Sequence, residues 1–413
     1  MKQRTHAAFA LAGSCGAIFW PGAFIFSLPG IMGAYWETAF SVGRGEVGRT
    51  LFFVLAGVGT FMFLVGKCQE RVGPARMAAA GAILCGASTL LLGRAQGIAA
   101  VWAWAFTVGS ASAFVYVPAL TVVQQWYPER RGLASGLVNL SFGLSAAVMA
   151  PIFGVLLSIM GPKGMTALVG AAALVTGLGV SPWIRRPERT GVHAPGPSHY
   201  GEGPPLRSLT VAESLRTRAF WCLWLTWALA GAAGISMVTM ATSFARAQGL
   251  DTGKGVLLLT AFNLTNGTGR IVSGYLSDRF GRRIVMSVAF GGAGISYAFM
   301  PAVQGLILWS VMAAAVGFAF GTLFSVSAPL ASERFGLRHF GAIFGLIFTA
   351  YGFLAGVLGP WVSGYILDVT GGNFTLVFGY LGAFFLVPAV LVPFAGPVSR
   401  VAVPVSPAAG NKA

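Results

Sequence analysis

Arg270 is the side chain of this sequence that points most directly to a chemical task. It lies within the apolar stretch from Gly255 to Leu276, where a central arginine costs roughly 2.5 to 3.5 kcal/mol on membrane-insertion scales. No aspartate or glutamate occupies the middle of any apolar segment, so the sequence offers no anionic partner at that depth. We therefore predict that Arg270 binds an anion from outside the chain, and a transported anion is the natural candidate.

Polar residues recur around Arg270 at helical spacing. Asn263, Asn266, Arg270, Ser273 and Ser277 fall on one stripe of a helix. A polar stripe on a membrane helix is expected to face a cavity. Hydrogen bonding between helices is the alternative, which we favour for Ser273 and Ser277, whereas Asn266, one turn from Arg270, is assigned to the binding site.

The composition places these residues in an integral membrane protein. Of the 413 residues 56% are hydrophobic and 9% are charged, against about 25% charged in a soluble domain. The 58 glycines suit closely packed helices that move against one another. The net charge of +16 does not indicate a nucleic-acid partner, because the positions of the Lys and Arg residues follow the membrane topology.

Twelve apolar segments are long enough to span a bilayer, which takes about 20 residues per helix. We predict an all-α membrane protein with twelve transmembrane helices in two six-helix bundles. The first segment follows Lys2 and Arg4 but is too long for a signal peptide. The segments are 7–36, 48–66, 77–93, 97–125, 132–160, 164–184, 217–245, 255–277, 284–301, 304–331, 340–367 and 374–395.

Charge and composition divide the chain further. Of the 27 Lys and Arg residues, twenty lie in connections on one side, six lie on the other, and Arg270 is the remaining one. The positive-inside rule then puts both termini in the cytoplasm, in a plasma or bacterial inner membrane. The predicted domains are an N-terminal bundle 1–184, a Pro- and Gly-rich cytoplasmic linker 185–216, a C-terminal bundle 217–396 and a cytoplasmic tail 397–413.

The remaining reactive residue types give no sign of a metal, a cofactor or an enzyme. The four histidines lie in the linker or near membrane edges, and the four cysteines lack metal-ligand spacing. The helices contain no cluster of acids, histidines or nucleophiles, and the short tail argues against a sensor. We expect a monomer without metal or cofactor. These residues are His6, His193, His199, His339, Cys15, Cys68, Cys85 and Cys222.

The two halves of the chain repeat each other. The connection Gly66–Arg76 returns as Gly274–Arg283 at an offset of 208 residues, and the entry Arg131–Gly136 returns as His339–Gly345 at an offset of 209. Two matches at nearly one offset indicate an internal duplication, with the halves related by a pseudo-two-fold axis.

These connections resemble the loop signature of the major facilitator superfamily, G-x-x-x-D-[RK]-x-G-[RK]-[RK]. Gly274–Arg283 matches it in full, and Gly66–Arg76 matches with glutamate for aspartate and a less regular tail. The resemblance implies the two-bundle fold and a cytoplasmic ion pair that forms in one state and breaks in another. The residues assigned to gating are Glu70, Arg71, Asp278 and Arg279.

A narrower resemblance concerns the stretch Trp126–Gly136, which is similar to the R-R-x-L-A-x-G signature of monocarboxylate porters and of oxalate/formate antiporters. In both groups an arginine in the eighth span is taken to bind the substrate carboxylate, which implies that role for Arg270. Tyr351 stands where dianion antiporters carry a second positive residue, so one carboxylate is implied. Asn266 stands where mammalian porters carry an aspartate, and the first span has no lysine, which puts their proton relay in doubt.

Aromatic and apolar residues are predicted to complete the binding site. The two tyrosines are favoured because a phenol deep in a membrane needs a hydrogen-bond partner, while each other member has ordinary packing as its alternative. A small apolar pocket with one arginine fits a short organic anion such as lactate, pyruvate or acetate. The candidates are Leu28, Tyr116, Phe142, Phe320, Phe324, Phe348 and Tyr351.

We therefore predict a proton-coupled monocarboxylate transporter that works by alternating access. The proton arrives with the substrate or through a water network at Asn266. An anion exchanger, which needs no proton site, and a passive facilitator for small carboxylates stay open as alternatives.

Overall fold

The computed structural model describes residues 2–187, 208–250 and 252–395, and these residues form helices without a strand. The predicted linker lies mostly outside the described residues, and the predicted tail lies wholly outside them. The N-terminal bundle comprises α1 (Lys2–Phe26), α2 (Leu28–Phe40), α3 (Arg44–Val72), α4 (Pro74–Leu92), α5 (Ile98–Trp126), α6 (Arg131–Val180) and a 3₁₀ turn, Ser181–Trp183.

The C-terminal bundle follows the short helix α7 (Val211–Leu215). It comprises α8 (Arg218–Ala247), α9 (Thr252–Phe280), α10 (Arg282–Phe299), α11 (Leu306–Phe335), α12 (Phe340–Ala350), α13 (Val362–Thr370), α14 (Phe374–Leu391) and a 3₁₀ turn, Val392–Ala395. Two π-helical turns, Tyr351–Ala355 and Val357–Trp361, connect α12 to α13. Pro360 lies in the second turn and cannot donate a backbone hydrogen bond there.

The crossings match the twelve predicted segments, with local differences that proline and glycine explain. The first crossing is α1 plus α2, broken at Ser27 because Pro29 follows in the first turn of α2. The fifth and sixth crossings run on as α6, which turns at Gly161, where φ is 68° and Pro162 follows.

Among the described residues, nine helical stretches are long and apolar enough to span a membrane, and one of these, Arg131–Trp183, holds two crossings. Helices α9 and α10 complete the C-terminal bundle without reaching that apolarity. Their sequences explain this, because α9 carries the polar residues around Arg270 and α10 begins with Arg282 and Arg283. The prediction of an all-α membrane protein with two bundles is confirmed.

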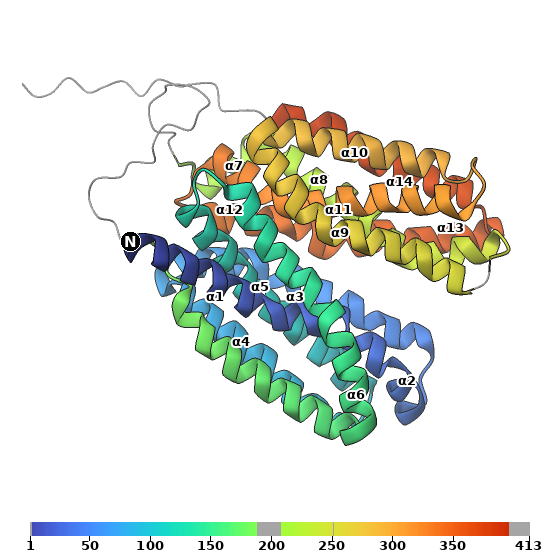
Figure 1. The fold of residues 1–413 in the computed structure, drawn as a ribbon, viewed down its shortest axis with the longest axis horizontal. Coiled ribbons are helices and arrows are strands. Elements are labelled where there is room, and N and C mark those ends of the chain that lie inside the picture. Colours follow the sequence, from blue (N-terminus) through green and yellow to red (C-terminus); the bar gives the residue numbers. More distant parts are fainter. Residues whose placement is uncertain (1, 188–207, 251, 396–413) are drawn as a thin grey trace, which may run out of the picture.

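The two bundles meet at one end and diverge toward the other (Figure 1). We call the end that bears the N-terminus and α7 the closed end, and the end that bears α2 and α13 the diverging end. At the closed end α3 crosses α12, and α6 crosses α9.

Glycines permit both crossings. A Cβ atom on Gly66 would lie 2.0 Å from the carbonyl oxygen of Gly341, and one on Gly274 would lie 2.4 Å from that of Gly132. Because these four glycines come from the two repeated connections, the duplication seen in the sequence becomes a symmetric pair of helix crossings.

Candidate functional site

Arg270 lies at the interface of the two bundles, in the middle of α9, with 2% of its surface exposed. Its Nη1 donates a hydrogen bond of 2.6 Å to the main-chain carbonyl of Asn139 on α6, and its Nη2 donates one of 3.4 Å to Oδ1 of Asn266. The guanidinium carbon lies 4.9 Å from the ring centre of Phe324. Within the described part of the chain, no carboxylate forms an ion pair with Arg270.

A cavity opens beside this arginine, with walls from both bundles. Five of the predicted site residues line it: Tyr116, Phe142, Phe324, Phe348 and Tyr351. The other lining residues are apolar except for one serine, and they come from α1, α3 and α5. They are Ile25, Phe26, Leu51, Val54, Leu55, Val58, Met62 and Ser112.

The structure places two predicted site residues away from this cavity. Leu28 is buried at the start of α2. Phe320 packs against Phe262 and Phe324, with ring centres 6.0 and 5.2 Å apart. Both are therefore packing residues in this conformation.

Arg270 and Asn266 are not among the lining residues, but Arg270 lies directly behind one of them, Phe324. The ring of Phe324 has one face toward the Arg270 guanidinium and also borders the cavity. The arginine is thus one aromatic layer away from the space where a ligand would enter.

The sequence predicted that the polar stripe on α9 faces a cavity, but several residues of the stripe do not face it. Asn263 is exposed and is not among the residues that line the cavity. Ser273 forms a 2.9 Å hydrogen bond with Ser325 of α11, and Ser277 donates to the carbonyl of Gly274. For Ser273 the helix-to-helix bond that the sequence offered as the alternative is the observed one, because α9 packs along α11.

Asn139 is a central residue of the site that the sequence reasoning missed. The hydroxyl of Tyr116 donates to its Oδ1 at 2.9 Å. Its Nδ2 donates to the carbonyl of Ser135 at 2.9 Å and, across the bundle interface, to that of Phe324 at 3.1 Å. The signal was present in the sequence, since a buried amide in the middle of an apolar segment is as exceptional as Asn266.

The duplication extends into the site. Gly136 approaches the carbonyl oxygen of Arg270, and the corresponding Gly345 approaches that of Met62, with Cβ-to-oxygen distances of 2.4 and 2.3 Å. Met62 therefore occupies in α3 the place that Arg270 occupies in α9. One half of the symmetric scaffold carries the charge and the other carries a thioether.

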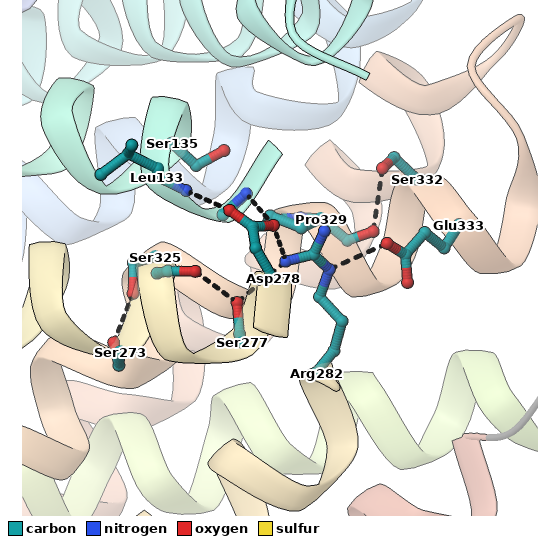
Figure 2. Close-up of polar contacts among 12 residues, drawn as sticks. Leu133, Ser135, Ser273, Ser277, Asp278, Arg282, Ser325, Pro329, Ser332 and Glu333 are labelled. Carbon is teal, nitrogen blue, oxygen red and sulfur yellow. Dashed lines mark hydrogen bonds and ion pairs between the residues drawn. The ribbon is translucent and has the colours of Figure 1, made fainter. Parts of the chain in front are cut away.

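At the closed end, Asp278 joins the two bundles (Figure 2). Its carboxylate accepts hydrogen bonds from the backbone N–H groups of Gly132 and Leu133, at 3.0 and 2.9 Å, in the first turn of α6. A negative charge is favourable there, because the first N–H groups of a helix are unpaired and carry partial positive charge. Arg282 pairs with Asp278 at 2.5 Å and with Glu333 at 2.9 Å.

The symmetric contact uses Glu70, whose carboxylate oxygens lie 3.0 and 3.2 Å from Nδ1 of His339 on the other bundle. The structure therefore brings two of the four predicted gating residues into contacts between the bundles. Arg71 and Arg279 are exposed, and the guanidinium of Arg279 lies 5.8 Å from the ring of Phe280. Arg282, three residues later in the motif, pairs with the aspartate in its place.

The Asp278 contact predicts a measurable loss of protection. Asp278→Asn removes the charge that pairs with Arg282 and weakens the bonds to the first turn of α6, which are worth roughly 1.5 to 3 kcal/mol as hydrogen bonds to a charged group. In hydrogen–deuterium exchange, a peptide covering the start of α6 should exchange roughly ten- to a hundredfold faster. Glu129→Gln, in an exposed loop position, is the control; equal protection in Asp278→Asn and in the parent would contradict the assignment.

Comparison with protein-family models assigns the chain to one family. The model of the Major Facilitator Superfamily matches residues 9–259 and 255–411. The uncharacterized MFS-type transporter YhjX of Escherichia coli K12 is 28% identical over 323 residues, 76% of each chain. The oxalate:formate antiporter of Oxalobacter formigenes is 25% identical, over 83% of this chain and 81% of its own. Monocarboxylate transporter 13 of Rattus norvegicus is 26% identical, over 89% and 85%.

Solved structures show the same fold. The MFS transporter FucP in the outward conformation superposes with a TM-score of 0.73, over 95% of this chain and 100% of its own, at 16% sequence identity. The proton:xylose symporter XylE gives a TM-score of 0.71 at 14% identity, over 94% and 95%. At these identities the likeness concerns the fold alone.

Proposed function

Because the chain belongs to the major facilitator superfamily, a family of transporters and not of enzymes, we propose that it carries small monocarboxylates such as lactate or pyruvate, together with protons. The named relatives support this substrate class, since an oxalate:formate antiporter and monocarboxylate transporters match most of the chain. The resemblance at Trp126–Gly136 supports the same branch.

One observation carries the proposal: Arg270 is a buried cation, free of carboxylate partners among the described residues, beside an apolar cavity between the bundles. A guanidinium offers five donors in a planar fork that matches a carboxylate. Two of those donors are engaged with Asn139 and Asn266. A single positive charge suits a single carboxylate, and the apolar walls suit a short carbon chain more than a sugar.

The mechanism that fits this geometry is alternating access. The structure is closed at the end with the glycine crossings, so the substrate enters from the diverging end. Its carboxylate pairs with Arg270, and neutralising that charge lowers the cost of enclosing the site. The two bundles then rock about the site so that the diverging end closes and the other end opens.

The orientation we propose follows from the charges of the connections. The closed end carries the loops rich in Lys and Arg, including both copies of the repeated connection, and so it would face the cytoplasm. The state observed here is then an outward-facing one. We further propose that the protein acts as a monomer in a plasma or bacterial inner membrane.

The proposal is tested by uptake of radiolabelled L-lactate into proteoliposomes, with and without an inward proton gradient. Accumulation above the external concentration that depends on the gradient is the expected result. Absence of lactate uptake under any gradient, and also with an internal anion such as formate, would refute the substrate class. Uptake that never exceeds the external concentration would indicate a passive facilitator.

A specific observation favours anion exchange as the second candidate. Asn266, an amide, is the side chain that contacts Arg270 from the preceding turn, and an amide does not titrate as a proton carrier would. An exchanger needs no proton site, because each half-cycle is completed with an anion bound. Lactate uptake that requires an internal anion such as formate, and that ignores the proton gradient, would select this candidate.

A further inference from the structure

Asn139 contacts three parts of the protein that substrate transport must connect. Its main-chain carbonyl accepts the hydrogen bond from Arg270, its Oδ1 accepts from Tyr116 on the cavity wall, and its Nδ2 donates to the carbonyl of Phe324. Asn139 belongs to the N-terminal bundle, whereas Arg270 and Phe324 belong to the C-terminal bundle. Two of these three bonds therefore hold the bundles together.

We propose that Asn139 is the positioning residue through which an anion at Arg270 loosens the contact between the bundles. This inference rests on the proposed function of Arg270 as the carboxylate site. Before the anion arrives, Asn139 accepts from the Tyr116 hydroxyl and from one N–H group of Arg270, two donors that a carboxylate in the cavity would also engage. After it arrives, those donors turn to the ligand and the bundles keep fewer bonds.

The competition favours the ligand on chemical grounds. A carboxylate that reaches the cavity can accept from the Arg270 guanidinium and from the Tyr116 hydroxyl. A carboxylate adds the attraction of a full negative charge for the Arg270 guanidinium, which the neutral carbonyl lacks, and it gives the Tyr116 hydroxyl a charged acceptor in place of a neutral one. The donors thus leave Asn139 for the carboxylate, and of the bonds that cross the interface at Asn139 only the one to Phe324 remains.

A continuous hydrogen-bond chain leads from Asn139 toward the closed end. Asn139 donates to the carbonyl of Ser135, and the Ser135 hydroxyl accepts from Nε2 of Gln124. Oε1 of Gln124 accepts from the hydroxyl of Ser332, at 3.1 Å and across the interface. Ser332 immediately precedes Glu333, the partner of Arg282 in the closed-end contact (Figure 2).

Besides its hydrogen bonds at the site, Asn139 occupies a place on α6 from which a change at the site is passed to the closed end. It lies two turns beyond Gly132 on α6, between the cavity and the point where α6 crosses α9. A change in its bonds acts on the same helix whose first turn is held by Asp278.

Two pairs of spin labels can measure the opening of each end. Gln96→Cys with Gln304→Cys reports on the diverging end, and Glu129→Cys with Arg338→Cys reports on the closed end. All four positions are exposed, and each pair joins corresponding loops of the two bundles. The four natural cysteines are replaced by alanine, and distances are measured on the full chain in nanodiscs by electron–electron double resonance.

Asn139→Leu keeps the branched shape of the side chain and the main-chain carbonyl but removes the bonds to Tyr116 and Phe324. Without any ligand, it should raise the ratio of closed-end-open to closed-end-shut molecules by roughly three- to tenfold, the effect of losing a buried hydrogen bond. The closed-end pair should lengthen while the diverging-end pair shortens. Ser145→Ala is the matched control, because Ser145 is equally buried on α6 and its hydroxyl bonds within the helix to the carbonyl of Phe142.

Tyr116→Phe is the second variant, needed in case Asn139→Leu disturbs folding. It removes only the hydroxyl that donates to Asn139, and it should shift both distances in the same direction by a smaller factor. If both variants give the distances of the parent, or if Ser145→Ala shifts them equally, the inference is wrong.

Measuring the spin-label distances with lactate distinguishes a failure of this inference from a failure of the proposed function. Saturating L-lactate should shift the distances in the parent and shift those of Asn139→Leu by a clearly smaller amount, since this variant retains only the main-chain bond to Arg270. A parent that ignores lactate, combined with a shift in the ligand-free Asn139→Leu protein, would contradict lactate as the substrate while supporting the role of Asn139. A full lactate response in Asn139→Leu would overturn that role.

Discussion

Arg270→Ala is expected to lower carboxylate transport by at least about thirtyfold, because removing a charged partner of a buried ion pair costs roughly 2 to 5 kcal/mol. The loss should appear in the initial rate of L-lactate uptake into proteoliposomes at subsaturating lactate. The protein should still fold, since within the described ranges the arginine makes two hydrogen bonds and has no acidic partner, so its removal eliminates an unpaired buried charge.

Two further variants give this prediction its specificity. Arg246→Ala removes an exposed arginine at the end of α8 and should leave uptake near that of the parent. Arg270→Lys keeps the charge but not the planar fork, so it should recover only part of the rate. Undiminished uptake by Arg270→Ala would mean that the carboxylate binds elsewhere.

Gly66→Ala is expected to give the second large effect, through the shape of the interface. The new Cβ would lie 2.0 Å from the carbonyl oxygen of Gly341 and 2.4 Å from its carbonyl carbon. Both are backbone atoms, so neither rotates away, and α3 and α12 have to separate. We expect the closed end to stay open and transport to fall by roughly tenfold or more, since an overpacked contact costs about 1 to 3 kcal/mol.

The measurement is the spin-label distance between Glu129→Cys and Arg338→Cys, taken together with lactate uptake. Gly291→Ala is the control, because a Cβ there meets no atom within 4 Å. A closed-end distance unchanged by Gly66→Ala would show that the bundles do not need this close approach.

Much of the fold could be predicted because hydrophobic length and internal repetition are visible in a sequence. A span needs about 20 apolar residues whatever surrounds it, and the duplicated loop fixes which helices correspond. The turn at Gly161 falls between the predicted segments 132–160 and 164–184, whereas the break at Ser27 was not predicted, because Pro29 acts only through the local backbone around it.

The site was harder to predict because side-chain partners depend on how two helices are rotated against each other. The position of Arg270 followed from the cost of a buried charge, but its contact with Asn139 requires α6 to lie against α9 with those faces together. The same rotation determines that Asp278 meets Arg282, one helical turn onward, while Arg279 points outward. A motif gives the residue types, and packing selects among them.

The unequal halves of the scaffold have a consequence for the membrane potential. Arg270 has Met62 as its counterpart in the other repeat, so the empty central site carries one uncompensated positive charge, and a bound carboxylate cancels it. Each elementary charge that crosses the full field is worth about 2.3 kcal/mol per 100 mV. Voltage would therefore act on the return of the empty protein. It would leave the loaded step nearly untouched where the carboxylate crosses alone, as in anion exchange, and would act on that step as well where a proton crosses with the carboxylate.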